Sequence, residues 1–264
     1  MPLLESLRRA SARRLLACAT ALTLFAASFG TTPSVTADEG SLNTPPEGFT
    51  LLFNGKDLTG WQGLLARPND NPAKRAELSP EERAKLQAEA DETMKAHWSV
   101  ADGVIVFDGK GASLQTAKDY RNFELYVDWL ILPAGDSGIY LRGTPQVQIW
   151  DAEKETVGSG GLFNNKIGPS QPSVTADKPV GQWNTFFIRM IDDKVTVFLN
   201  GTQVVNDVVL ENYWDRSKPI FERGPIELQN HGNTLRFRNI YLRELPDDLR
   251  DGTASSDASP TKTK

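Results

Sequence analysis

Hydrophobic and polar residues alternate in short runs along most of the chain. From Val195 to Leu199, aliphatic residues take every second position, and the run stops at Asn200-Gly201. Successive strand side chains point to opposite faces, so such a run predicts a half-buried strand, and Asn-Gly favours a two-residue hairpin turn. Similar runs occupy residues 123–129, 183–190, 226–229 and 235–240. Many short alternating strands predict an all-β sandwich or jelly roll over about residues 48–245.

One segment departs from this pattern. Ser79 and Glu82 have the spacing of a capping box, with Pro80 at the first helical position between them. A charged helix is therefore expected from Pro80 to about residue 95, within an insertion over about residues 64–96. Its few apolar positions are Leu86, Ala90 and Met94. We expect a solvated decoration of the sandwich, with a lid over a binding site as the alternative.

The two ends of the chain differ from the middle. Residues 1–37 resemble a secretory signal: a basic start, an apolar run over 15–29, and Val35-Thr36-Ala37 before a cleavage point at Asp38. The apolar run, about 15 residues, is short for a membrane span. We therefore expect no membrane span and an exported protein, periplasmic or extracellular. Residues 38–47 are predicted to be a linker, and residues 246–264 a disordered tail with almost no apolar content.

Charge and cysteine content narrow the function. Removing residues 1–37 takes four of the 29 basic and one of the 34 acidic residues, which leaves 25 and 33 and a net charge of about −8. This balance argues against nucleic acid and anionic membranes as partners. Cys18, the single cysteine, lies in the signal, so the mature chain has neither disulfides nor thiolate chemistry. Two histidines, His97 and His231, are too few for a multi-histidine zinc site.

The stretch over residues 137–151 suggests a binding face. Its alternation predicts a hairpin whose aliphatic face packs inward, on Ile139, Leu141, Val147 and Ile149. The opposite face carries a phenol, a guanidinium, two amides and an indole, on Tyr140, Arg142, Gln146, Gln148 and Trp150. Such a surface suits an uncharged polar ligand with apolar faces, such as a sugar. An ordinary hairpin with a wet outer face gives the same pattern.

A second polar group follows later in the chain. Glu227, Gln229 and His231 fall on alternate positions and are expected to share the face of Gln146, Gln148 and Trp150. His231, at the end of that strand, is a candidate general base, and a surface histidine in a turn is the alternative.

Direct glycoside hydrolysis is not favoured, because no strand carries the Glu-x-Asp-x-Glu carboxylate pattern of jelly-roll glucanases. Gln146 and Gln148 occupy the comparable strand, and an amide neither protonates a leaving group as an acid nor attacks as a nucleophile. Glu124 and Asp128 are expected on an outer face. Asp151 follows the strand at its end.

Seven short motifs occur in order along the chain and resemble those of the 3-keto-disaccharide hydrolase domain family. They begin with Asn54-Gly55-Lys56-Asp57-Leu58-Thr59-Gly60-Trp61. The others lie at residues 98–103, 137–143, 146–151, 181–184, 198–201 and 228–232, the last followed by 236–240. The match covers about residues 48–245, and the 64–96 insertion resembles that of one subgroup.

The resemblance implies a concanavalin A-like jelly roll that acts on 3-keto-glycosides. In these sugars a separate oxidoreductase has converted the C3 hydroxyl to a ketone, which acidifies the C2 hydrogen. A base removes that proton, the C1 substituent leaves by elimination, and water adds afterwards. Such an enzyme needs a base, a stabiliser for the enolate and an acid for the leaving group.

The resemblance also suggests roles for individual residues. His231 would be the base or the acid, and Arg142, with Arg236, would stabilise the enolate oxygen. Asp151 would be the second proton-transfer group, or a ligand of a divalent metal such as Ca²⁺; no cofactor is certain. Substrate contacts are expected from Tyr140, Gln146, Gln148, Trp150, Glu227, Gln229, Asn230 and Arg236. Family members often carry Asp where this chain has Asn230, which removes one carboxylate near His231.

Two other functions remain open at this point. A non-catalytic, lectin-like carbohydrate-binding module would keep the sandwich and the sugar-facing strand. A laminin-G-like interaction domain with a calcium site near Asp136 and Asp151 would use the acidic loops instead, although no dense calcium loop is present. Fold alone does not decide among these functions.

Overall fold

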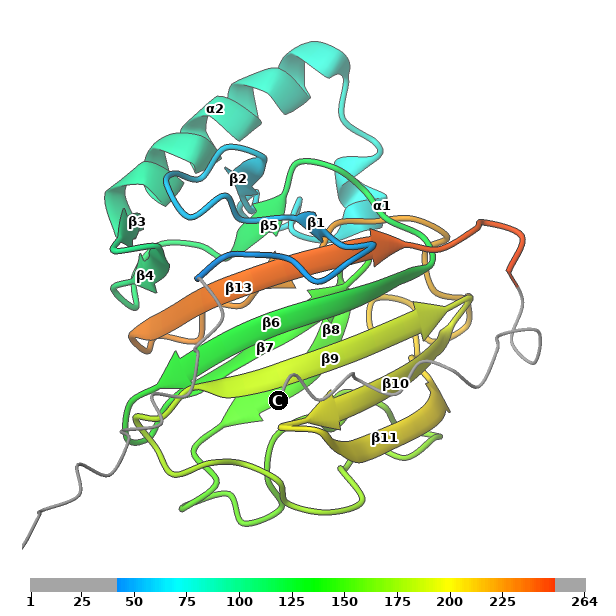
Figure 1. The fold of residues 1–264 in the computed structure, drawn as a ribbon. Coiled ribbons are helices and arrows are strands. Elements are labelled where there is room, and N and C mark those ends of the chain that lie inside the picture. Colours follow the sequence, from blue (N-terminus) through cyan, green and yellow to red (C-terminus); the bar gives the residue numbers. More distant parts are fainter. Residues whose placement is uncertain (1–41, 250–264) are drawn as a thin grey trace, which may run out of the picture. The chain divides into compact units, whose positions relative to one another are not determined.

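The computed structural model describes residues 42–249, which form two packed antiparallel sheets (Figure 1). The larger sheet has the order β11 (Thr202–Val209), β10 (Lys194–Leu199), β9 (Asn184–Ile191), β6 (Phe123–Ile131), β13 (Leu235–Glu244), β4 (Val104–Phe107) and β3 (Trp98–Ala101), and β1 (Thr50–Leu51) pairs with β13. The smaller sheet has the order β2 (Trp61–Gly63), β5 (Leu114–Thr116), β12 (Glu227–Leu228), β7 (Asp136–Leu141) and β8 (Thr144–Trp150). The predicted all-β sandwich is confirmed.

One hydrophobic core joins the two sheets. The aliphatic faces predicted from alternation are buried in it, including Ile139 and Ile149 of the smaller sheet and Val195 and Val197 of the larger. Trp98 closes one end of the core, where its ring stacks on Phe107 at a centroid distance of 4.1 Å. Because the side chains of the inner faces pack in the core, a ligand can contact only the outer faces, the loops and the insertion.

The insertion contains two helices, α1 (Pro72–Arg75) and α2 (Pro80–His97). The capping box at Ser79 is present and α2 begins at Pro80, as predicted. α1 was not predicted, because a single turn leaves too little periodicity to detect. α2 lies beside β2 at one end of the sandwich (Figure 1).

Contacts at Gly63 fix α2 against the smaller sheet. The Gly63 N–H donates to Asp91 Oδ1 at 2.9 Å, and Gln87 Nε2 donates to the Gly63 carbonyl at 2.9 Å. A Cβ at Gly63 would lie 2.2 Å from the Ala90 carbonyl oxygen, so only glycine permits this approach. The helix is therefore packed on the sheet edge, and is more than a solvated decoration.

Residues on both sides of the predicted domain contact the sandwich. The expected signal at 1–37 and the tail from residue 250 lie outside the described residues. Asn43, in the expected linker, exchanges hydrogen bonds with Asn239, and Asn122 Nδ2 donates to the carbonyls of Pro246 and Leu249 at 2.9 and 3.2 Å. Residues 42–47 and 246–249 thus pack on the sandwich. Within residues 42–249, no helix has the length and apolarity that a membrane crossing needs.

Candidate functional site

A pocket of about 400 Å³ lies on the outer face of the smaller sheet. Eight of the residues expected to contact substrate or transfer protons line it: Tyr140, Gln146, Gln148, Trp150, Glu227, Gln229, Asn230 and His231. The insertion adds Leu64, Arg67 and Asp70 to the wall, and the segment between β11 and β12 adds Tyr213 and Trp214. Polar strand faces far apart in sequence therefore meet in one pocket, as their alternation predicted.

Strand register explains how these side chains meet. Glu227 on β12 pairs with Tyr140 on β7 and with Gln115 on β5, so the three side chains share one face across adjacent strands. Farther along β7, Gly138 pairs with Gln148. A Cβ at Gly138 would lie 3.0 Å from Gln146 Cδ, so glycine here leaves space for the Gln146 side chain.

A chain of polar contacts runs from the pocket floor to its rim. Gln146 Nε2 donates to Gln148 Oε1, and Gln148 Nε2 donates to Asp136 Oδ1 at 2.8 Å. The other Asp136 oxygen, Oδ2, lies 3.4 Å from His231 Nδ1. The His231 side chain is 56% exposed, so its ring is open to solvent beside the Asp136 carboxylate. A histidine oriented by a carboxylate is a common arrangement for proton transfer.

Glu227 is the buried carboxyl of the pocket floor. It is 3% exposed, and within residues 42–249 no Lys, Arg or His nitrogen lies within 4.0 Å of its oxygens. Burial raises the pKa of Glu227 to about 7, against a lowering by a hydrogen bond from Ser113 and by the charge of Arg75. Such a carboxyl changes protonation near neutral pH, which suits a general base or acid.

Tyr140 stands next to Glu227 on the same face. Burial, and then the neighbouring Glu227 charge, raise the pKa of Tyr140, so its hydroxyl keeps its proton at neutral pH. Gln229 Nε2 donates to the Tyr140 oxygen at 3.4 Å. With the oxygen accepting from Gln229, the Tyr140 hydrogen is left to donate toward a ligand.

Three buried polar atoms around Glu227 have no hydrogen-bond partner among the described residues. They are Arg75 Nε, Gln115 Nε2 and Gln229 Oε1. Arg75, on α1, is itself buried and donates from Nη1 to Gln115 Oε1 at 2.8 Å, so the insertion places a cation on the same sheet face, beside the floor. Buried polar groups are nearly always hydrogen-bonded, so these atoms call for water or ligand hydroxyls.

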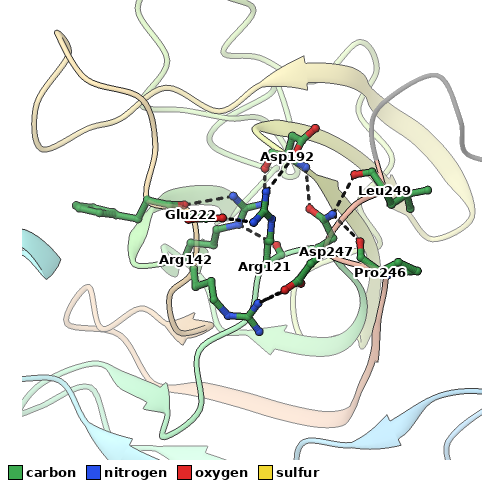
Figure 2. A network of polar contacts seen from close by, with 10 residues as sticks. Arg121, Arg142, Asp192, Glu222, Pro246, Asp247 and Leu249 are labelled. Carbon is green, nitrogen blue, oxygen red and sulfur yellow. Dashed lines mark hydrogen bonds and ion pairs between the residues drawn. The ribbon is translucent and has the colours of Figure 1, made fainter.

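Arg142 lies outside the pocket, which corrects its expected place on the sugar-facing strand. β7 ends at Leu141, and Arg142 takes a left-handed conformation (φ 53°) in the turn, so strand alternation does not reach it. Its guanidinium donates to the carbonyls of Arg121 (2.9 Å), Phe221 (3.2 Å) and Asp192. Figure 2 shows the guanidinium groups of Arg121 and Arg142 close together between Asp192 and Glu222.

The environment of Arg142 fits an anchoring role. It is 2% exposed, and burial, then the charge of Arg121, lower the pKa of Arg142 to about 10. The next residue, Gly143, accepts a hydrogen bond from Trp214 Nε1 at 2.8 Å. The Arg142-Gly143 turn thus holds the segment that carries the pocket residues Tyr213 and Trp214, and Arg142 does not line the pocket.

Two further expected site residues also lie elsewhere. Asp151 is buried, and its oxygens accept the backbone N–H groups of Ala134 (2.7 Å) and Glu153 (2.9 Å), so its carboxylate stabilises a loop. Arg236 is exposed on β13, in the larger sheet. Among residues 42–249, no three His, Cys, Asp or Glu side chains gather as a metal site, and Asp151 does not fit a metal ligand because its oxygens are already used.

Sequence reasoning missed several pocket residues. Strand alternation could have placed Asp136 in the pocket, because it precedes Gly138 and Tyr140 on the same strand face. From the sequence alone, Asp136 is named only as part of an acidic loop. Arg67 and Asp70 from the insertion, and Tyr213 and Trp214 from the long β11–β12 connection, carry no periodic signal. Their place depends on contacts between distant segments, which a single sequence does not reveal.

Fold and pocket together define a β-sandwich protein with a polar binding site on one sheet, which contains a buried carboxyl and a histidine–carboxylate pair. Residues 48–243 match the model of the 3-keto-alpha-glucoside-1,2-lyase-like domain. The chain therefore belongs to this family, and the resemblance seen in its motifs is confirmed.

Individual relatives agree with this assignment. A 3-keto-disaccharide hydrolase of Bacteroides thetaiotaomicron is 23% identical to this chain over 79% of it and 83% of the relative. A crystal structure from Parabacteroides distasonis, provisionally assigned as a glycosyl hydrolase, matches 78% of this chain and 100% of its own, with 24% identity and a TM-score of 0.58. A second structure from that organism, assigned likewise, matches 76% and 85% with 27% identity and a TM-score of 0.56.

Proposed function

We propose that this protein cleaves the glycosidic bond of 3-keto-glycosides by removing the C2 proton and eliminating the C1 substituent, followed by hydration. The observation that carries the proposal is the pairing of two proton-transfer groups in one pocket: buried Glu227 at the floor and the His231–Asp136 pair at the rim. The name of the Bacteroides relative supports the same substrate class.

Glu227 acts as the base in this proposal. Its carboxylate takes the C2 proton, and the electron pair of that bond moves into an enolate whose charge lies on the C3 oxygen. A pKa of about 7 makes Glu227 a stronger base than an ordinary carboxylate, and about half of the carboxyl groups are ionised at neutral pH. The adjacent Tyr140 hydroxyl donates to the enolate oxygen, the role expected of Arg142 from the sequence alone.

His231 acts as the acid. When the enolate collapses, the C1–O bond breaks, and the protonated imidazole supplies a proton to the departing oxygen. The Asp136 carboxylate lies beside the ring, with Oδ2 3.4 Å from Nδ1. Water then adds at C1 and a proton returns to C2, which completes a net hydrolysis.

Three associated expectations belong to the proposal. A separate sugar 3-oxidoreductase must supply the ketone, because nothing in the proposed chemistry oxidises C3. We also propose export to the periplasm or the outside, because residues 1–37 resemble a secretory signal. A requirement for a divalent metal such as Ca²⁺ stays a prediction, with no ligand set proposed for it.

The test is turnover of a panel of 3-keto-glycosides and their unoxidised parents, each with and without EDTA. We expect cleavage of the keto forms only. Sugar binding without cleavage of either form would contradict the proposal and favour a lectin-like module. Loss of activity with EDTA and recovery with Ca²⁺ would establish a metal requirement. Arg236→Ala, on the larger sheet, serves as the control variant and should keep wild-type rates.

A further inference from the structure

A second, smaller pocket of about 80 Å³ adjoins the main one. The two pockets share Gln148, Trp150 and Phe163, and the smaller one continues between the segments around residues 158–163 and 170–172. A ligand in the main pocket therefore has a neighbouring space for a substituent, reached past the Trp150–Phe163 pair.

Backbone contacts build this second pocket along the edge of β8. Gln148 N–H donates to the Gly161 carbonyl at 2.9 Å, and Gly160 N–H donates to the Gln148 carbonyl at 2.8 Å. Trp150 Nε1 donates to the Gly158 carbonyl at 2.7 Å, which fixes the indole. A Cβ at Gly161 would lie 2.6 Å from the Ser170 carbonyl oxygen, so the second segment packs closely on the first.

An aromatic pair separates the two pockets. The rings of Trp150 and Phe163 meet edge to face, at a centroid distance of 5.3 Å and an interplanar angle of 77°. Phe163 is 51% exposed, which leaves a large apolar face open beside a binding site. Pro172 adds a second apolar surface to the smaller pocket.

The two pockets differ in the charge of the side chains that line them. Arg67, Asp70, Asp136, Glu227 and His231 all line the main pocket. Among the described residues, the lining of the second pocket includes no charged side chain, and its polar groups are the neutral ones of Gln148, Ser170 and Gln171. An uncharged group gains contact there without leaving a charge unpaired, whereas a carboxylate or phosphate would be desolvated without a cation.

We propose that the second pocket is the subsite for the leaving group, and that it selects an uncharged ring with a flat apolar face, an aryl group being the simplest case. This inference rests on the proposed function. The keto sugar occupies the main pocket, and its C1 substituent lies against Phe163. His231 is suitably placed, because Asp136, its partner, pairs across the sheet with Trp150. The phenol formed on protonation leaves through the second pocket.

The first test compares three 3-keto-glucosides, with methyl, phenyl and 4-carboxyphenyl groups at C1, on the wild type and Phe163→Ala. We expect kcat/KM to fall about tenfold further for the phenyl substrate than for the methyl substrate, whose sugar touches Phe163 only in the main pocket. The ratio of kcat/KM between variant and wild type is taken for each substrate separately, so that the intrinsic reactivity of the leaving group cancels. The wild type should also use the 4-carboxyphenyl substrate less efficiently than the phenyl one.

Val174→Ala is the matched control, because Val174 is also exposed, lies on a neighbouring segment and lines neither pocket. It should leave all three kcat/KM values unchanged. Equal losses for methyl and phenyl substrates in Phe163→Ala, or no loss for either, would overturn the subsite.

A binding measurement separates this inference from the proposed function. Ligand-observed NMR saturation transfer to unoxidised phenyl glucoside needs no turnover. We expect strong transfer to the phenyl protons in the wild type and much less in Phe163→Ala, with transfer to the sugar protons retained. If no keto-glycoside is cleaved, the proposed function is wrong, and the NMR experiment still tests whether the second pocket binds the phenyl group. If the wild type shows no transfer to the phenyl protons, the proposed subsite is wrong.

Discussion

Each sheet of the sandwich buries a glutamate on its outer face, but the two carboxyl groups are treated differently. Glu124 on β6 is 1% exposed, accepts a hydrogen bond from Arg243 Nε at 2.7 Å and lies 3.8 Å from Arg189 Nε. Glu227 on β12 is 3% exposed and has no cation at ion-pair distance within the described residues. The first is an ion pair within the sheet, whereas the second has a hydrogen bond from Ser113 and no ion-pair partner beside the pocket.

The difference identifies the site better than polarity alone. Glu124 and Asp128 lie on a face where register supplies a basic or polar partner to each carboxylate, such as Arg238 beside Asp128 at 3.3 Å. Beside Glu124 one buried polar atom, Arg189 Nε, has no hydrogen-bond partner among the described residues, whereas around Glu227 there are three: Arg75 Nε, Gln115 Nε2 and Gln229 Oε1. Satisfied charges serve stability, whereas buried polar groups left unsatisfied beside a pocket point to a ligand.

The largest expected effect comes from exchanging each glutamate for glutamine. Glu227→Gln should lower kcat for 3-keto-glycosides by about 10²–10⁴-fold, because the amide cannot accept the C2 proton. Its free energy of unfolding should not fall, because the change removes a buried charge without breaking an ion pair. Steady-state kinetics and chemical denaturation measure the two quantities.

Glu124→Gln is the matched control. It should lower the free energy of unfolding by about 2 kcal/mol, because Arg243 and Arg189 lose their carboxylate. Turnover should remain at the wild-type rate below the unfolding transition. If Glu124→Gln loses activity while Glu227→Gln keeps it, the assignment of Glu124 to stability and of Glu227 to catalysis is wrong.

His231→Ala should lower kcat by about 10²-fold, because the departing oxygen loses its acid. The deficit should shrink for 3-keto-glycosides whose leaving group is a good one, such as 4-nitrophenol, since that oxygen needs no proton. A deficit of the same size for good and poor leaving groups would remove His231 from the acid role.

Arg142→Met tests the anchoring role against the catalytic one. Three partly buried carbonyls would lose their donor, so the free energy of unfolding should fall by about 2–4 kcal/mol. At temperatures where the variant is folded, kcat should change less than tenfold. A large loss of kcat with wild-type stability would show that Arg142 has a catalytic role and would contradict the anchoring role.

Stability should depend on pH through Glu227. Its carboxyl has an ordinary pKa near 4.5 in the unfolded chain and one of about 7 in the folded protein. The folded state therefore binds more protons between these values, so Glu227 progressively lowers stability as the pH rises from about 4.5 to about 7. The free-energy difference between Glu227→Gln and the wild type should grow by about 2–3 kcal/mol from pH 5 to pH 8 in denaturation experiments. A constant difference would mean that the carboxyl ionises normally.

The smallest effect is expected from Arg75→Met. The charge of Arg75 favours the ionised form of Glu227, so its loss should move the acidic limb of the kcat/KM profile to higher pH. The rate at pH 8, where Glu227 is ionised in both proteins, should change less than tenfold. If the acidic limb does not move, the charge of Arg75 does not affect the pKa of Glu227.

Local pattern was enough to predict the sandwich and half of the site. Tyr140, Gln146, Gln148 and Trp150 lie on regular strands, where a period of two fixes the face. Arg142 sits one residue beyond the end of β7, where a turn replaces the alternation and turns its side chain away. Arg75 and Tyr213 reach the site through long-range packing, which no local pattern encodes. Glu227 was located correctly, but its chemical importance depends on burial that only the fold creates.

The most direct test of the account is the fate of the C2 hydrogen. A methyl 3-keto-glucoside would be cleaved in D₂O, and the 3-keto-glucose released would be examined by NMR at early times, with enzyme-free product as the exchange control. Elimination and hydration predict one deuterium at C2 in each product molecule. Product that retains its C2 hydrogen would show that the glycosidic bond breaks without proton abstraction, and would contradict the role of Glu227 as base.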